Sequence, residues 1–188
     1  VFLILTLVLS LGTLVFFKYT GFLVSTMPFL EGTALGSLEI ALPIGISFYT
    51  FQALSYIIDV YRGDVKAQKS WVNFAMYISL FPQLIAGPIV RYSDVESQIE
   101  DRTVTFDGMA KGIQRFVLGL GKKVLLANQI GALWEIMSGN GSVLGAWLAA
   151  VAFAFQIYFD FSAYSDMAIG LGRMFGFEFT ENFRYPCQ

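Results

Sequence analysis

The chain has 188 residues and a formal net charge of −2, and 56% of its residues are hydrophobic, 16% aromatic and 14% charged. Its mean hydropathy of +0.63 excludes an ordinary soluble domain and predicts an integral membrane protein. The near-neutral charge and the small, scattered basic clusters argue against nucleic acid as a partner.

The first expected element is a membrane span over Val1–Phe17, which is apolar apart from Ser, Thr and one Gly. The chain begins inside this apolar run without an initiator Met, and it stops two residues after Pro186. We therefore expect one membrane domain over 1–188 that is incomplete at both ends. A loop over Thr20–Glu39, partly at the membrane interface, should follow the span.

A second helix is expected from Pro43, at the first helical position, to about Tyr61. Gln52, Ser55 and Asp59 share a narrow arc of this helix and form a polar stripe that should point into the protein. This stripe either fixes helix packing through hydrogen bonds or lines a cavity. A basic loop follows, and the positive-inside rule places it in the cytoplasm. Its basic residues are Arg62, Lys66 and Lys69.

A third span is predicted over Trp71–Val90, with Trp71 as an interfacial anchor. Pro82 and Pro88 should interrupt its second half, and broken membrane helices occur where freed backbone groups meet protein or a water-filled cavity. The string FPQLIAGPIVRY is therefore a candidate cavity wall. The polar, acidic stretch Arg91–Asp107 is expected to be an exposed connection.

A cationic amphipathic helix is predicted next, capped by Asp107. Lys111, Arg115 and Lys122 form a stripe on one face, opposite an apolar face. The apolar residues are Met109, Ile113, Phe116, Leu120 and Val124. Such a helix is typical of the membrane surface, with its basic side chains among headgroups. The alternative is a docking site for an acidic partner.

The remaining helices contain the carboxylates of interest. Helix should continue over Asn128–Gly141 and break at the sequence SGNG. Val143–Gly176 is too long for one ordinary span and is polar near its middle. It predicts two helices, or one bent helix, meeting around Asp160–Asp166.

Carboxylates near a bilayer centre are costly, so Asp160 and Asp166 must face protein or water. An ion pair of Asp166 with Arg173, or a bond from Asp160 to a Tyr or Gln of a neighbouring helix, would satisfy them without any catalytic role. Otherwise they mark a substrate or proton path. Helical spacing predicts two polar faces here, with Gln156, Asp160 and Tyr164 on one and Ser162, Asp166 and Arg173 on the other.

Histidine is absent from the chain, which removes the commonest general base and metal ligand. The one cysteine, Cys187, allows neither an internal disulfide nor a cysteine metal cluster. No metal and no bound cofactor are therefore expected. Glu181 and Asn182 lie in a polar loop after the last apolar helix, which spacing alone reads as an ordinary connection and which also suits a cavity rim.

Three strings together resemble the membrane-bound O-acyltransferase family, in particular the bacterial branch that acetylates alginate and related polysaccharides. They are LPIGISFYTFQALSYIIDVYRG at 42–63, FPQLIAGPIVRY at 81–92 and FQIYFDFSAYSDMAIGLGRMFGFEFTENFRYP at 155–186. The resemblance is strongest over 42–186. It implies an all-α, multi-pass transmembrane bundle with broken or short helices.

The resemblance also implies acyl transfer inside a membrane tunnel, with a histidine that activates the acceptor hydroxyl. Asn182 matches the family's asparagine and would orient the acyl carbonyl or the histidine. That histidine has no counterpart here, so the chain alone is expected to be inactive. The expected tunnel lining consists of Gln156, Asp160, Tyr164, Ser165, Asp166 and Glu181.

On this resemblance the protein moves an acetyl or short acyl group toward a polysaccharide or cell-wall sugar hydroxyl in the bacterial inner membrane. The donor would be acyl-CoA or an acyl carrier protein. The other partners would be membrane lipid and either the acceptor polysaccharide or a periplasmic acetyl-transfer protein. Two alternatives stay open: a transporter or channel with carboxylates along its path, and a scaffold that passes acyl groups to a separate exported transferase.

Overall fold

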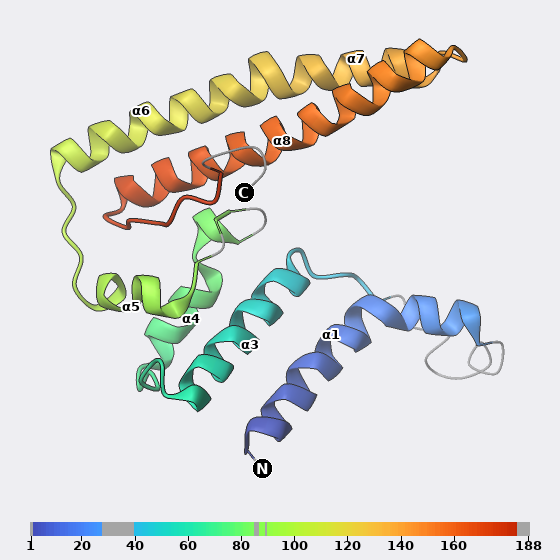
Figure 1. The fold of residues 1–188 in the computed structure, drawn as a ribbon. Coiled ribbons are helices and arrows are strands. Elements are labelled where there is room, and N and C mark those ends of the chain that lie inside the picture. Colours follow the sequence, from blue (N-terminus) through green and yellow to red (C-terminus); the bar gives the residue numbers. More distant parts are fainter. Residues whose placement is uncertain (1, 28–39, 85–86, 89, 184–188) are drawn as a thin grey trace. The chain divides into compact units, whose positions relative to one another are not determined.

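The structure is a computed structural model that describes residues 2–27, 40–84, 87–88 and 90–183. Throughout these residues the regular structure is helical, with no strand, which confirms the predicted all-α class (Figure 1). The chain forms two compact units. The first contains Val1–Leu80 and Arg91–Ser93, and the second contains Phe81–Val90 and Asp94–Gln188.

The first unit begins with α1 (Phe2–Thr26), which is longer than the expected span. The predicted loop at Thr20 is wrong up to Thr26, because the hydroxyls there bond back into the helix. The Thr20 hydroxyl donates to the carbonyl of Phe16 at 2.5 Å, and that of Thr26 donates to the carbonyl of Phe22 at 2.8 Å. Polar side chains therefore stay satisfied in an apolar setting. The rest of the expected loop, 28–39, lies outside the described residues.

The second helix, α3 (Ile46–Arg62), lies against α1, where Lys18 Nζ donates to Ser47 Oγ at 3.0 Å. It begins three residues later than predicted. Pro43 precedes the helix and its carbonyl accepts from the N–H of Ile46, while Gly45 at φ 77° is the N-cap. A left-handed residue there favours glycine, so proline is not at the first helical position.

Aromatic packing joins α3, α4 (Trp71–Ser79) and the start of α5 (Tyr92–Glu100) within this unit. Tyr77 and Tyr92 are fully buried, and their ring centroids are 5.1 Å apart. The ring centroid of Tyr56 lies 4.9 Å from that of Tyr92. Gln52 Nε2 donates to the carbonyl of Tyr77 at 2.9 Å. At Gln52 the polar stripe therefore points into the protein, as predicted. Its hydrogen bond there fixes the packing of α3 against α4.

The stretch Trp71–Val90 is interrupted at Pro82, as predicted, but no long spanning helix precedes the interruption. Residues 85–86 and 89 of this stretch lie outside the described residues. The helix α4 has nine residues, about 14 Å in length, and ends at Ser79 before the 3₁₀ turn η1 (Phe81–Gln83). Pro82 falls in this turn, since its missing N–H and fixed φ oppose a continuing α-helix.

The predicted exposed connection Arg91–Asp107 is also wrong in part. Tyr92–Glu100 forms α5, in which Val95 and Ile99 are buried while Glu96 is half-buried and Glu100 exposed. The apolar residues at i and i+4 define one face of this helix.

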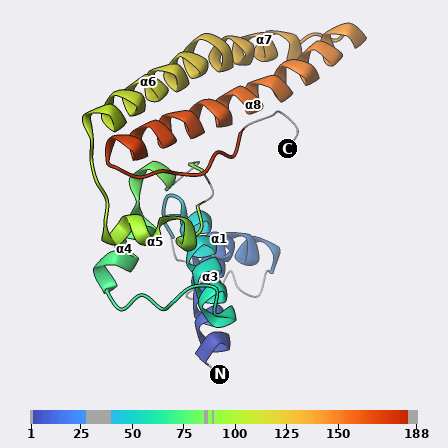
Figure 2. The same cartoon turned by 60° about the vertical axis from the view of Figure 1, so that its left-hand side comes forward.

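The second unit is built on a long helical hairpin (Figures 1 and 2). One arm contains α6 (Phe106–Lys122), the π-helical turn η2 (Lys123–Ala127) and α7 (Asn128–Ser138), and the other is α8 (Val143–Met174). The expected division of α8 into two helices is wrong, because its 32 residues form one helix about 48 Å long. Thr105, not Asp107, caps α6, and its hydroxyl accepts from the N–H of Gly108 at 3.0 Å.

The two arms approach closely where small residues meet. A Cβ added at Gly119 would lie 2.8 Å from the carbonyl oxygen of Ala163, and one at Gly112 would lie 2.6 Å from that of Gly170. Backbone atoms cannot move away cheaply, so these positions require glycine. This is the packing expected of membrane helices, which associate through small residues rather than through a hydrophobic driving force.

Gly119→Ala should therefore destabilise the hairpin by about 1–3 kcal/mol, the usual cost of overpacking. Gly121→Ala is the matched control, because nothing lies within 4 Å of a Cβ added there. That change should be neutral or slightly stabilising. Thermal unfolding of both variants in detergent measures the difference, and an equal melting temperature for the two would contradict the close approach.

Within the described residues, three helices are long and apolar enough to cross a membrane: Leu3–Thr26, Phe106–Ser138 and Val143–Met174. The second includes the predicted amphipathic helix. Its apolar face is exposed at four of the five predicted residues, and the fifth, Phe116, is half-buried. Arg115 and Lys122 bond to α8, so for these two residues the prediction of headgroup contacts is wrong. The helix thus directs most of its apolar face outward and turns Arg115 and Lys122 toward α8, as suits a lipid environment. Lys111 stays exposed and pairs with Asp107.

Candidate active site

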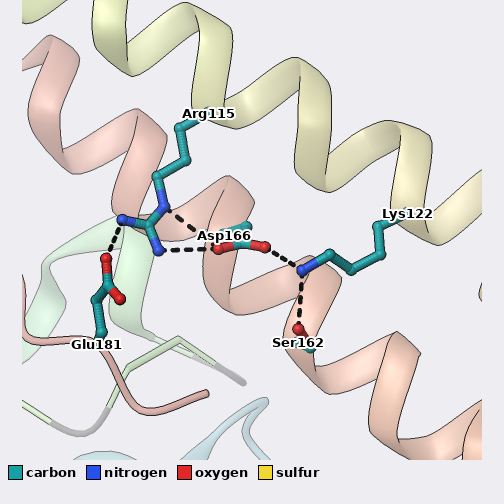
Figure 3. Close-up of polar contacts among 5 residues, drawn as sticks. All are labelled: Arg115, Lys122, Ser162, Asp166 and Glu181. Carbon is teal, nitrogen blue, oxygen red and sulfur yellow. Dashed lines mark hydrogen bonds and ion pairs between the residues drawn. The ribbon is translucent and has the colours of Figure 1, made fainter. Parts of the chain in front are cut away.

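Asp166, in the C-terminal half of α8, is bound by two cations from α6 (Figure 3). Arg115 donates to its Oδ1 from Nε at 3.2 Å and from Nη2 at 2.9 Å. Lys122 donates to its Oδ2 and also to Ser162 Oγ, the latter at 3.0 Å. The Asp166 side chain is only 21% exposed. A carboxylate sheltered from water in this way needs cationic partners, because an unpaired buried charge is strongly destabilising.

Arg115 also reaches the segment that follows α8. Its Nη1 donates to Glu181 Oε1 at 2.6 Å, so one guanidinium joins a helix carboxylate and a loop carboxylate (Figure 3). The planar group has N–H donors in fixed directions, which allows both contacts at once. Arg115 thereby connects α6, α8 and the loop.

Asp160 is paired with Lys123, the first residue of η2. Lys122 and Lys123 are consecutive, yet both reach carboxylates on α8. A π-helical turn changes the angular spacing of side chains and is common near functional sites. We call Arg115, Lys122, Lys123, Asp160, Asp166 and Glu181 the ion network, in which three cations balance three carboxylates.

Both proposed structural partners of the carboxylates are wrong. Asp166 bonds Arg115 and Lys122 rather than Arg173, whose nearest acid is Glu178 at 4.0 Å. Asp160 bonds a lysine rather than a Tyr or Gln. The basic stripe was visible in the sequence, but spacing along one helix does not reveal which helix lies opposite.

The chain reverses at Gly176 and runs back beside α8 as the return segment, defined as residues 177–183 (Figures 1 and 2). Gly176 has φ 80°, a conformation that favours glycine. Phe177 and Phe179 are buried, and Phe179 lies against Gly172 of α8. Phe183 packs on Tyr158 at a centroid distance of 6.2 Å.

Gln98 of α5 holds the start of the return segment. Its Oε1 accepts from the N–H of Glu178 at 2.7 Å, and its Nε2 donates to the carbonyl of Glu178 at 3.3 Å. One side-chain amide thus satisfies both backbone groups of a residue in an irregular segment. The sequence alone gave no signal for this contact, because the two residues are 80 positions apart.

The return segment places Asn182 next to Glu181, half-buried beside α8. Two other predicted residues are sheltered. Ser165 is 2% exposed, and its Oγ has no hydrogen-bond partner among the described residues. Gln156 packs on Gly131 of α7, and its Oε1 likewise finds no partner in the part of the chain that the structure describes.

Two grooves adjoin these residues. Asp166 and Arg115 line one of about 360 Å³ together with Arg173. Tyr164 lines another, smaller and mainly apolar, of about 140 Å³ with Phe81. Asp166 and Tyr164 therefore face different grooves.

Comparison of the sequence with known proteins identifies the family of this chain. The profile of the membrane-bound O-acyltransferase family matches residues 65–187, which include α6, α8 and the return segment up to Asn182 and beyond. The chain belongs to the membrane-bound O-acyltransferase family. The three candidate spans fit membership of a membrane protein family.

Curated relatives match along nearly the whole chain. It is 48% identical to the probable alginate O-acetylase AlgI of Pseudomonas aeruginosa, over 98% of this chain and 36% of the relative. It is 46% identical to the protein of the same name from Azotobacter vinelandii, over 97% and 38%. Identity to the peptidoglycan O-acetyltransferase of Helicobacter pylori is 32%, over 98% and 41%. The chain thus spans 36–41% of the length of these relatives.

Proposed function

We propose that the protein containing this chain is a membrane-embedded O-acyltransferase that moves an acetyl or other short acyl group to a polysaccharide or cell-wall sugar hydroxyl. The supporting observation is the similarity, at 48% identity over 98% of the chain, to a relative named as an alginate O-acetylase. In this proposal the chain is part of one membrane domain, and that domain lies in the bacterial inner membrane.

In this proposal a histidine from another part of the protein takes the proton of the acceptor hydroxyl while the hydroxyl oxygen attacks the acyl carbon. The bond between the acyl carbon and the donor's sulfur breaks, the ester forms, and the histidine gives the proton to the departing sulfur. Acyl-CoA or an acyl carrier protein is the donor. Asn182 orients the acyl carbonyl or the histidine, and the tunnel lining comprises the predicted set: Gln156, Asp160, Tyr164, Ser165, Asp166 and Glu181.

The relatives favour this proposal over a transporter, because those given above are named as an acetylase or an acetyltransferase. Asp160 and Asp166, the carboxylates expected along a permeation path, are each paired with lysine or arginine. Such pairing occurs in both classes of membrane protein and does not distinguish them.

Complementation tests the proposal. The full-length gene, expressed in a Pseudomonas strain that lacks its own alginate O-acetylase, should restore O-acetyl esters on the exported polymer. Proton NMR of the purified polymer measures the esters, and an immunoblot of membranes controls for insertion. Inserted protein without ester formation would contradict alginate as the acceptor. Ester formation that persists after deletion of a periplasmic partner would exclude the scaffold alternative.

A further inference from the structure

We propose that Arg115 is a positioning residue for acyl transfer, because it fixes Glu181 and thereby the adjacent Asn182 against α8. This inference rests on the proposed function. It adds a residue that neither periodicity nor family resemblance indicates, since Arg115 belongs to a stripe that the sequence assigns to lipid headgroups.

The first step concerns the freedom of the return segment. The segment has no regular secondary structure, so no helix ladder fixes its backbone. Its beginning is held by the burial of Phe177 and Phe179 and by the two hydrogen bonds of Gln98. Asn182 lies beyond these contacts, and directly after it Phe183 packs on Tyr158 of α8 at a centroid distance of 6.2 Å. Between these apolar contacts, the polar residues 180–182 need a constraint of their own.

The second step identifies that constraint. Across positions 180–182, which the structure describes in full, the pair from Arg115 to Glu181 is the one side-chain hydrogen bond or ion pair. The Glu181 side chain is 45% exposed, so burial does not hold it. Residues 181 and 182 are consecutive, and fixing one restricts the backbone of the other.

The third step shows why Arg115 itself is fixed. Two of its N–H groups bind Asp166 Oδ1, and Asp166 is in turn held by Lys122. The third donor, on Nη1, is left for Glu181. A lysine ammonium is a point charge on a flexible stem and lacks this fixed fork. The geometry therefore requires arginine rather than any cation.

The experiment compares Arg115→Lys and Glu181→Gln in the full-length protein. Glu178→Gln is the matched control, because it removes the same charge in the same segment from a side chain that is 79% exposed. The kcat of acetyl transfer should fall about 100-fold in both test variants, because a small displacement of reacting groups is enough to cause a loss of that size. The donor KM should change little, and Glu178→Gln should match the wild type in both constants.

A second readout follows the segment directly. A spin label at Thr180→Cys, in a background from which Cys187 and any other cysteine of the full-length protein have been removed, should become more mobile in Arg115→Lys and Glu181→Gln. It should not become more mobile in Glu178→Gln. Unchanged mobility in both test variants, or increased mobility with wild-type kcat, would overturn the inference. If the wild type itself transfers no acyl group, the proposed function fails, while the spin label still reports whether Arg115 orders the segment.

Discussion

Asp166→Asn should be the most destabilising single substitution in the ion network. The neutral amide leaves Arg115 and Lys122 without the carboxylate that both of them bind. Breaking a buried pair costs about 3–5 kcal/mol, and the 21% exposure of Asp166 places the expected loss nearer to about 2–4 kcal/mol. Because native proteins are stable by only about 5–15 kcal/mol, detergent-purified protein should show a clearly lower melting temperature and yield.

Asp107→Asn is the control for this prediction. Asp107 also forms an ion pair, with Lys111 at 2.5 Å, but the two side chains are 73% and 53% exposed. Such i, i+4 surface pairs contribute about 0.3–0.5 kcal/mol, so the melting temperature should barely change. Equal losses for the two aspartates would show that Asp166 is solvated in the folded protein, and the sheltered network would be disproved.

The sequence predicted the class of fold because its dominant signals are local. Apolar runs of the right length indicate spanning helices, and two aspartates inside such a run indicate shelter from lipid. In the structure α8 is a 32-residue helix and both aspartates are ion-paired. Asp166 is sheltered at 21% exposure, whereas Asp160 is 41% exposed. Of the two forms expected for this stretch, two helices or one bent helix, only the division into two helices failed. The carboxylates suggested a break that their pairing makes unnecessary.

The charged stripe of α6 shows where sequence reasoning ended. The same amphipathic pattern fits a helix on the membrane surface and a helix that turns its charges toward a neighbour. The distinction depends on acceptors 44 and 51 positions away, Asp166 for Lys122 and for Arg115. Periodicity identifies the face of a helix but contains no information about its partner.

Helix ends were predicted less well than helix identity. The first helix was expected to end at Phe17, yet α1 continues to Thr26, and the hydroxyls of Thr20 and Thr26 bond back to carbonyls four residues earlier. The helix α3 starts at Ile46 with Gly45 as its N-cap, three residues after the expected start at Pro43. These differences change boundaries by three to nine residues and leave the site unaffected.

Family resemblance, rather than spacing, selected Asn182 as a site residue. The structure adds its surroundings, since the segment around it is held by Gln98 and Arg115 from two other helices. Neither contact follows from the sequence near Asn182. A preorganised loop is what a group that orients a reacting carbonyl requires, because its position must be set before the reaction starts.

Asn182→Ala should abolish acyl transfer in the full-length protein while membrane insertion stays normal. The substitution removes an amide that is half-buried and has no side-chain hydrogen bond within the described part of the chain, so little stability depends on it. If the amide stabilises the developing oxyanion or orients the base, its loss should reduce kcat about 100- to 1,000-fold. The measurement is O-acetyl ester formed per inserted protein.

Thr180→Ala is the control, because it changes the same segment and leaves the Asn182 amide in place. Thr180 is exposed and two residues away, so a general sensitivity of the segment would affect both variants, whereas a chemical role affects Asn182 alone. Activity near the wild-type level in Asn182→Ala would remove this residue from the site. Equal losses of activity in the two variants would assign the effect to the conformation of the return segment. They would contradict a chemical role for the Asn182 amide.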